Sequence, residues 1–94
     1  MVSVPMISGL VLANCWLDKS ESALKAIWRI NGVSEVYRTA GIYDLIVRVE
    51  AENLYKLREI VRRIKGTSGI LSTFTNIVYN AQAGMGPIIS TDAA

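Results

Sequence analysis

The chain of 94 residues has room for one domain, and its 51% hydrophobic content with a net charge of only +2 excludes an intrinsically disordered chain. It contains no histidine, which excludes His-based acid–base catalysis and imidazole metal sites, and its single cysteine cannot form an internal disulfide. The small net charge also argues against a dedicated nucleic-acid binder. We expect a soluble, cytoplasmic protein without a metal or another cofactor.

The first half of the sequence predicts a strand followed by a helix. The apolar run Ile7–Trp16 is rich in β-forming residues and barely alternates, which is typical of a strand covered on both faces. A helix is expected at roughly Lys19–Asn31, because Asp18 and Glu21 have the spacing of a capping box and Asn31-Gly32 is a helix stop. The residues predicted on one face of this helix are Leu24, Ile27 and Trp28.

A hairpin of two strands is expected next. Val33–Thr39 alternates moderately, with Val36 on the face opposite Val33, Glu35 and Tyr37. After Ala40-Gly41, the extended pattern resumes over Ile42–Glu50. The residues that share one face of this second strand are Leu45, Val47 and Val49.

The second half predicts a helix, a strand and a tail. Glu52–Lys65 is the clearest helix, with Glu52 in its first turn. Ile70–Asn80 is expected to be the fourth strand, and residues 81–94 a loose tail rich in small side chains. The apolar stripe predicted for the helix contains Leu54, Leu57, Ile60, Val61 and Ile64.

The element order β-α-β-β-α-β predicts an α+β, ferredoxin-like fold, in which both helices lie on one face of a four-stranded antiparallel sheet. That fold leaves the other sheet face bare, yet the first strand is apolar on both sides. The simplest cover for the bare face is the same face of a second copy, so we expect dimerisation through the sheets.

The sequence offers few candidates for catalytic groups. Cys15 lies in an apolar strand with no base to activate it, so a buried, inert thiol is expected. Four cations late in the second helix, Arg58, Arg62, Arg63 and Lys65, are interpreted as a solvated helix face rather than a nucleic-acid patch. We therefore expect neither catalytic residues nor metal ligands.

The hairpin Thr39–Asp44 is the most informative candidate site. Backbone N–H groups near Gly41 can hold a carboxylate, and the Asp44 side chain can hold an ammonium group. Together they suit the two charged ends of an amino acid. Ile42 and Tyr43 are expected to shape a pocket for the ligand side chain, and Thr73 and Thr75 to add hydroxyl contacts.

Two stretches resemble the effector-binding domain of the Lrp/AsnC family, also called the regulation-of-amino-acid-metabolism (RAM) domain. Gly32–Val49 contains the family's Gly-Val start and its Thr-x-Gly-x-Tyr/Phe-Asp hairpin. Gly69–Thr75 is similar to its Gly-Val-x-x-Thr-x-Thr strand, although Ser68 replaces the proline of a Pro-Gly pair. The resemblance covers about Ile7–Tyr79, so residues 7–80 are expected to form a RAM domain followed by the tail.

The resemblance implies a dimer with facing sheets, rings of such dimers, and an amino-acid effector held at dimer–dimer contacts by the hairpin loop and the fourth strand. By that match, the ligand-binding positions are Gly41, Tyr43, Asp44, Thr73 and Thr75. The chain begins directly at the first strand, as in the stand-alone prokaryotic members without a helix-turn-helix. It is therefore expected to act in transcription regulation by co-assembly with full-length relatives, without specific DNA binding of its own and without a membrane partner.

Two other functions remain open on the sequence alone. A dimeric α+β barrel enzyme, such as a small isomerase or monooxygenase, has the same element order, although the absence of histidine argues against it. A purely structural assembly module would bind no saturable ligand. The leading hypothesis is a non-enzymatic sensor that binds a small amino acid between subunits and couples it to oligomerisation or transcription.

Overall fold

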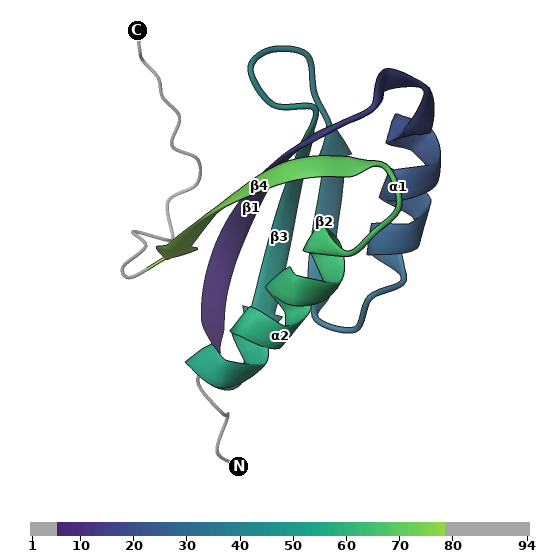
Figure 1. Cartoon of the computed structure of the whole chain (residues 1–94). Coiled ribbons are helices and arrows are strands. Elements are labelled where there is room, and N and C mark those ends of the chain that lie inside the picture. The colour runs from purple at the N-terminus through teal and green to yellow at the C-terminus, as the bar shows by residue number, and fades with distance from the viewer. Residues whose placement is uncertain (1–5, 79–94) are drawn as a thin grey trace, which may run out of the picture.

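The computed structural model describes residues 6–78, which form a four-stranded antiparallel sheet and two α-helices (Figure 1). The elements are β1 (Ile7–Cys15), the short 3₁₀ helix η1 (Leu17–Lys19), α1 (Ser20–Trp28), β2 (Val33–Arg38), β3 (Leu45–Ala51), α2 (Leu54–Lys65) and β4 (Ile70–Val78). The spatial order of the strands is β2-β3-β1-β4. This arrangement confirms the predicted ferredoxin-like fold. The expected tail, residues 81–94, lies outside the described residues.

The hydrophobic core lies between the sheet and the helices, and the two central strands supply most of it. α1 packs mainly on β2, and α2 packs across β1, β3 and β4. The shared face predicted for the third strand is confirmed. The largest fully buried side chains are Val11, Ile27, Leu45, Val47, Val49, Leu57 and Ile64. Burial of such a side chain stabilises the fold by about 1.5–3 kcal/mol relative to leaving it exposed.

The start of α1 differs from the expectation. Asp18 lies in η1, and the residue that precedes α1 is Lys19, whose side chain caps nothing. The predicted capping box is therefore wrong, because the chain makes a 3₁₀ turn before the helix begins. Trp28 is also misplaced by the prediction: it is 56% exposed, since α1 turns Ala23 and Ile27 toward the sheet instead.

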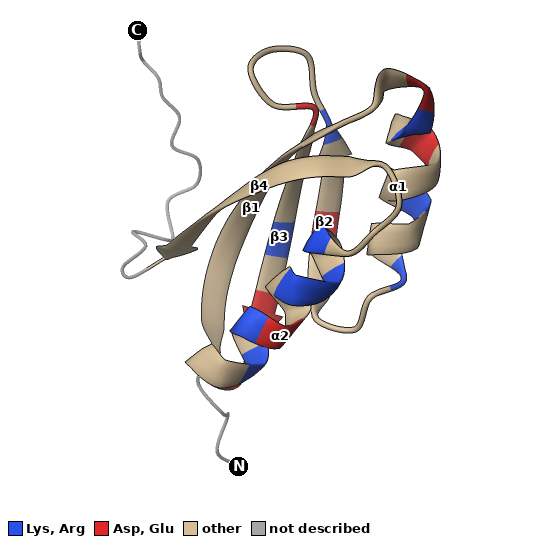
Figure 2. Ribbon diagram, viewed as in Figure 1, with Lys and Arg blue, Asp and Glu red and all other residues tan. Residues whose placement is uncertain are grey.

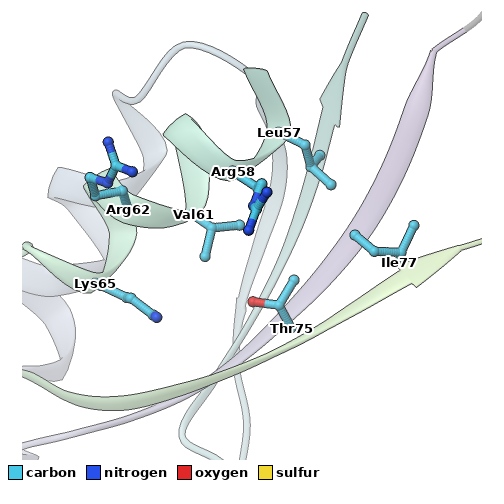
Figure 3. A pocket seen from close by; sticks show the side chains of 7 residues that line it. All are labelled: Leu57, Arg58, Val61, Arg62, Lys65, Thr75 and Ile77. Atoms are coloured by element: carbon cyan, nitrogen blue, oxygen red, sulfur yellow. The ribbon is translucent and has the colours of Figure 1, made fainter. Parts of the chain in front are cut away.

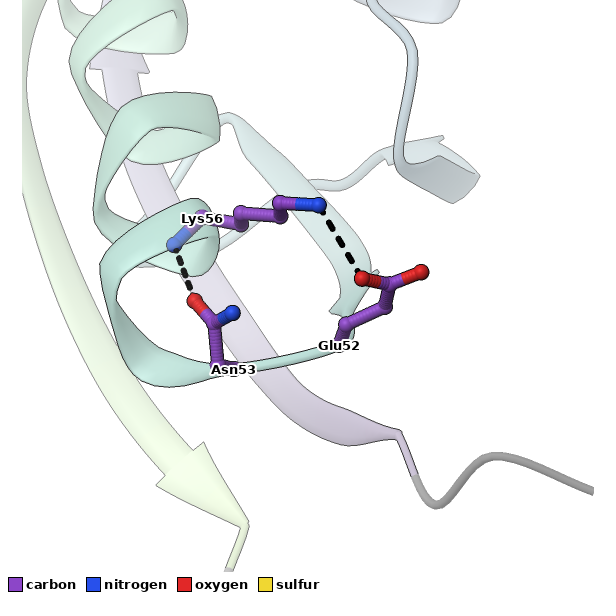
Figure 4. Close-up of polar contacts among 3 residues, drawn as sticks. All are labelled: Glu52, Asn53 and Lys56. Atoms are coloured by element: carbon purple, nitrogen blue, oxygen red, sulfur yellow. Dashed lines mark hydrogen bonds and ion pairs between the residues drawn. The ribbon is translucent and has the colours of Figure 1, made fainter.

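The start of α2 is fixed by Asn53, which was not among the predicted helix signals (Figure 4). The Asn53 side-chain oxygen accepts a 2.8 Å hydrogen bond from the Lys56 backbone N–H, as expected for an N-cap. Glu52 precedes this cap, so its expected place in the first turn is wrong. Its carboxylate still pairs with the Lys56 ammonium at 3.0 Å. Leu54 is exposed, whereas Leu57, Ile60 and Ile64 form the buried stripe.

Two register shifts alter which side chains share a face. Between Val33 and Glu35 the β2–β3 pairing shifts by one residue, so Val33 and Val36 both face the helices, contrary to the expected alternation. A second shift breaks the β1–β4 pairing between Asn14 and Cys15. Beyond it, Thr73 and Thr75 lie on the helix-covered face of β4.

The face of the sheet away from the helices carries one apolar row that crosses all four strands. The paired positions put Tyr37, Ile46, Leu12 and Phe74 side by side in strand order. Leu10 and Val78 extend this apolar area, which we call the bare sheet face. Leu12 therefore points to the bare sheet face, whereas its neighbour Val11 lies beneath the helices and is fully buried.

The two ends of the described fold lie together. Ser8, near the start of β1, pairs with Val78 at the end of β4. The β2–β3 loop lies at the opposite end of the sheet, beside the end of β1 (Figure 1). Within residues 6–78, no helix is long and apolar enough to cross a membrane.

Candidate functional site

The β2–β3 loop closes tightly on itself. The Thr39 backbone N–H donates to the Asp44 carbonyl at 2.9 Å, and the Thr39 hydroxyl donates to the Tyr43 carbonyl at 2.7 Å. Gly41 at the tip has φ +145°, and a Cβ built there would meet no atom within 4 Å. Ile42 is 84% exposed. The loop thus presents an open tip on a base fixed by hydrogen bonds. The predicted strand over Ile42–Glu50 begins three residues later, at Leu45.

Asp44 is bound to the end of β1. Its carboxylate oxygen Oδ2 accepts a 2.9 Å hydrogen bond from the Cys15 backbone N–H, and its own N–H donates to the Ala13 carbonyl. Asp44 therefore lies at the base of the hairpin rather than at its tip, and one oxygen has a structural partner. A carboxylate can accept about four hydrogen bonds in all, so Asp44 keeps capacity for a ligand donor.

Thr73 and Thr75 lie on β4, two strands away from β3. Thr73 pairs with Ala13 on one side of β1, and Leu45 pairs with Ala13 on the other. The whole of β1 therefore separates Thr73 from the strand that follows Asp44. Among the described residues, no hydrogen bond links either threonine to the β2–β3 loop. The structure thus places the six predicted ligand-binding residues in two separate groups.

The Thr73 hydroxyl is an unsatisfied polar atom. Its Oγ1 is buried and has no hydrogen-bond partner within the described part of the chain. A buried polar group without a partner costs about 1–3 kcal/mol, so such groups need an explanation in water or ligand binding. A cavity of about 310 Å³ adjoins it, lined by Lys65, Ile70, Leu71, Ser72 and Thr73.

A second cavity, which we call the α2–β4 groove, opens beside Thr75 (Figure 3). It has a volume of about 350 Å³ and is lined by Leu57, Arg58, Val61, Arg62, Lys65, Thr75 and Ile77. On the sequence alone its three cations are interpreted as a solvated helix face, and the groove is not predicted. Their spacing of four and three residues places them on one side of a helix, but only the position of β4 shows that they border a cavity.

Cys15 is buried at the end of β1, as expected. Burial raises the pKa of its thiol, the nearby Asp44 carboxylate raises the pKa further, and Arg38 partly opposes both effects. A raised pKa keeps the thiol protonated and weakly nucleophilic at neutral pH. The same shift makes this residue's contribution to stability decline as the pH rises above the ordinary thiol range, because the unfolded thiol ionises first.

We expect the native Cys15 thiol to react far more slowly with an aromatic disulfide reagent at pH 7.5 than the urea-unfolded chain does. Substitution Cys15→Ala should cost about 1–2 kcal/mol in the free energy of unfolding and leave ligand binding unchanged. Stopped-flow absorbance measures the labelling rate. Equal rates for the native and unfolded chains would contradict the buried, protonated thiol.

Similar proteins were found both by sequence and by structure. A family model described as the Lrp/AsnC ligand binding domain matches residues 13–84. A solved structure from Thermus thermophilus superposes with a TM-score of 0.76 at 28% identity, covering 80% of this chain and 95% of that one. AsnC of E. coli superposes with a TM-score of 0.71 at 24% identity, covering 90% of this chain but 55% of AsnC, which shows a shared fold.

A sequence relative comes from an enzyme. Homocitrate synthase of Saccharolobus islandicus (strain L.S.2.15 / Lassen #1) is 43% identical over 49 residues, which is 52% of this chain and 11% of the synthase. The match therefore spans about a tenth of the enzyme's length. Proteins of different overall size thus contain a segment similar to this chain.

Proposed function

The chain belongs to the Lrp/AsnC ligand-binding domain family, and from this we propose that it is a non-catalytic sensor that binds a small amino acid between subunits and couples its binding to assembly. The observation that carries the proposal is the Asp44 carboxylate, which the end of β1 holds at the base of an open loop. Similarity to the homocitrate synthases does not extend their catalysis to this chain, because the aligned segment is 11% of the enzyme.

The charges of the loop suit an amino acid. One oxygen of Asp44 is fixed by the Cys15 N–H, which holds the carboxylate in place for a ligand ammonium group. The exposed backbone around Gly41 offers N–H groups to the ligand carboxylate. Preorganisation of this kind lowers the entropic cost of binding. The partnerless Thr73 hydroxyl supports a further polar contact to a ligand from β4.

The separation of the two groups of residues supports a site formed by two chains. Since β1 lies between Asp44 and the β4 threonines within one subunit, we propose that the loop of one subunit meets β4 of another. The bare sheet face provides a contact for a dimer, and the loop-to-β4 contact joins dimers into a ring. A ligand bound at the second contact favours the larger assembly by mass action.

Asp44→Asn is expected to weaken amino-acid binding about 10- to 150-fold, because a hydrogen bond to a charged group contributes roughly 1.5–3 kcal/mol. The asparagine oxygen can still accept from the Cys15 N–H, so the melting temperature should stay close to that of the wild type. Calorimetric titration with each amino acid that raises the wild-type melting temperature measures the change. Asp18→Asn removes an exposed carboxylate elsewhere and serves as the matched control.

A mixing experiment tests the proposal that the site is shared. Asp44→Asn and Thr75→Val should each impair binding, but co-refolding equal amounts of the two variants should restore about one quarter of the sites, those with an intact loop from one chain and an intact β4 from another. A site within one subunit predicts no restoration. If no amino acid binds the wild type, the chain is a structural assembly module and the proposed function is wrong.

A further inference from the structure

The α2–β4 groove combines an apolar floor with a border of positive charge. Leu57, Val61 and Ile77 supply the floor, and the Thr75 hydroxyl lies on one wall. Figure 3 shows Arg58 and Lys65 projecting from α2 toward the cavity on the same side as Thr75. Its volume of about 350 Å³ lies at the lower end of the range for small-molecule sites.

No carboxylate of the described chain lines this groove. Arg62 pairs with Glu59 at 2.8 Å, and Glu59 lies outside the groove lining. Arg58 and Lys65 form no ion pair with any other side chain in residues 6–78. Figure 2 shows that several basic residues lie along α2.

The chemistry of these side chains defines the class of ligand. A guanidinium group binds a carboxylate with two parallel hydrogen bonds, and an ammonium group adds a third donor. The apolar floor suits a short methylene chain. A carboxylate on two or three methylenes fits both features.

We infer that the α2–β4 groove receives the side chain of the effector and selects an acidic amino acid over its neutral amide. This inference rests on the proposed function, because Thr75 belongs to both the proposed amino-acid site and the groove. Arg58 and Lys65 are the specificity-determining residues, and the β2–β3 loop recognises the ammonium and carboxylate groups common to all amino acids.

The test is calorimetric titration of the full chain with L-glutamate, L-glutamine and glutarate. We expect glutamate to bind about tenfold more tightly than glutamine, at the lower end for charged hydrogen bonds because these cations are exposed to solvent. The double variant R58Q/K65Q should lose that preference, with glutamine affinity unchanged. K25Q/R63Q removes the same charge from exposed positions outside the groove and should keep the preference.

The outcomes separate this inference from the proposed function. If the wild type binds glutamate and glutamine with equal affinity and Asp44→Asn weakens both, the inference is overturned and the proposed amino-acid site still stands. If R58Q/K65Q and K25Q/R63Q lose the preference for glutamate equally, the inference is also overturned, because the overall charge of the chain then explains the preference. If glutarate binds as tightly as glutamate, both depend on Arg58 and Lys65, and Asp44→Asn leaves the affinity for glutamate unchanged, the groove is an acid site and the amino-acid proposal is wrong. Absence of binding by all three ligands overturns the inference, whereas the proposed function is wrong only if no amino acid binds the wild type.

Discussion

Leu12→Asp is expected to abolish sheet-to-sheet association and leave folded monomers. Leu12 lies at the centre of the apolar row on the bare sheet face, with Ile46 on one side and Phe74 on the other. A carboxylate buried at this position without a partner costs several kcal/mol in an assembled dimer, whereas in a monomer the position is partly exposed to water. The variant therefore changes assembly more than folding.

Sedimentation velocity at micromolar concentration measures this effect, and far-UV circular dichroism checks that the monomer is folded. Ser22→Asp adds the same charge to an exposed position of α1 and should keep the wild-type mass. Val11→Asp places the charge in the core and should unfold the chain instead. A wild-type mass equal to one chain, or an unchanged mass for Leu12→Asp, would show that the bare sheet face is not the interface.

Gly32→Val is expected to destabilise the domain by about 3 kcal/mol or more. Gly32 follows α1 with φ +103°, a conformation that a β-branched residue adopts only with strain. A Cβ at this position would also overlap the Ile60 side chain, which belongs to the core. Strain and overpacking each cost roughly 1–3 kcal/mol, and total stabilities of domains are only about 5–15 kcal/mol.

Urea unfolding followed by tryptophan fluorescence measures the loss. Gly66→Ala is the matched control, because Gly66 has helical φ −82° and a Cβ there would lie 3.6 Å from its nearest neighbour. The control should keep or slightly raise the free energy of unfolding. Similar stabilities for the two variants would contradict the strained turn at Gly32.

The order of elements was predictable because each one has a strong local signal. The alternation of Leu45, Val47 and Val49 and the spacing of Leu57 and Ile64 each identify one buried face. The predictions are wrong where tertiary contacts determine which side chains are buried. Trp28 is exposed because α1 turns Ala23 and Ile27 toward the sheet. Val33 lies on the helix-covered face because the β2–β3 pairing shifts by one residue, and composition does not reveal such a shift.

The candidate site was only partly predictable for a related reason. The loop Gly41–Asp44 is recognisable from a glycine and a carboxylate at fixed spacing, yet the bond from Cys15 to Asp44 joins residues 29 positions apart. The cations of the α2–β4 groove have the same helical spacing as a solvated face. That Thr75 lines the same groove as these cations follows only from the pairing of β4 with β1.

The pairing of Ser8 with Val78 has a consequence for how such a domain is joined to others. The polypeptide enters and leaves the fold at one end of the sheet, and the β2–β3 loop lies at the other. A covalent attachment before β1 or after β4 therefore leaves the loop accessible. Further domains can thus be joined on the Ser8–Val78 side without altering the hydrogen bonds that close the β2–β3 loop.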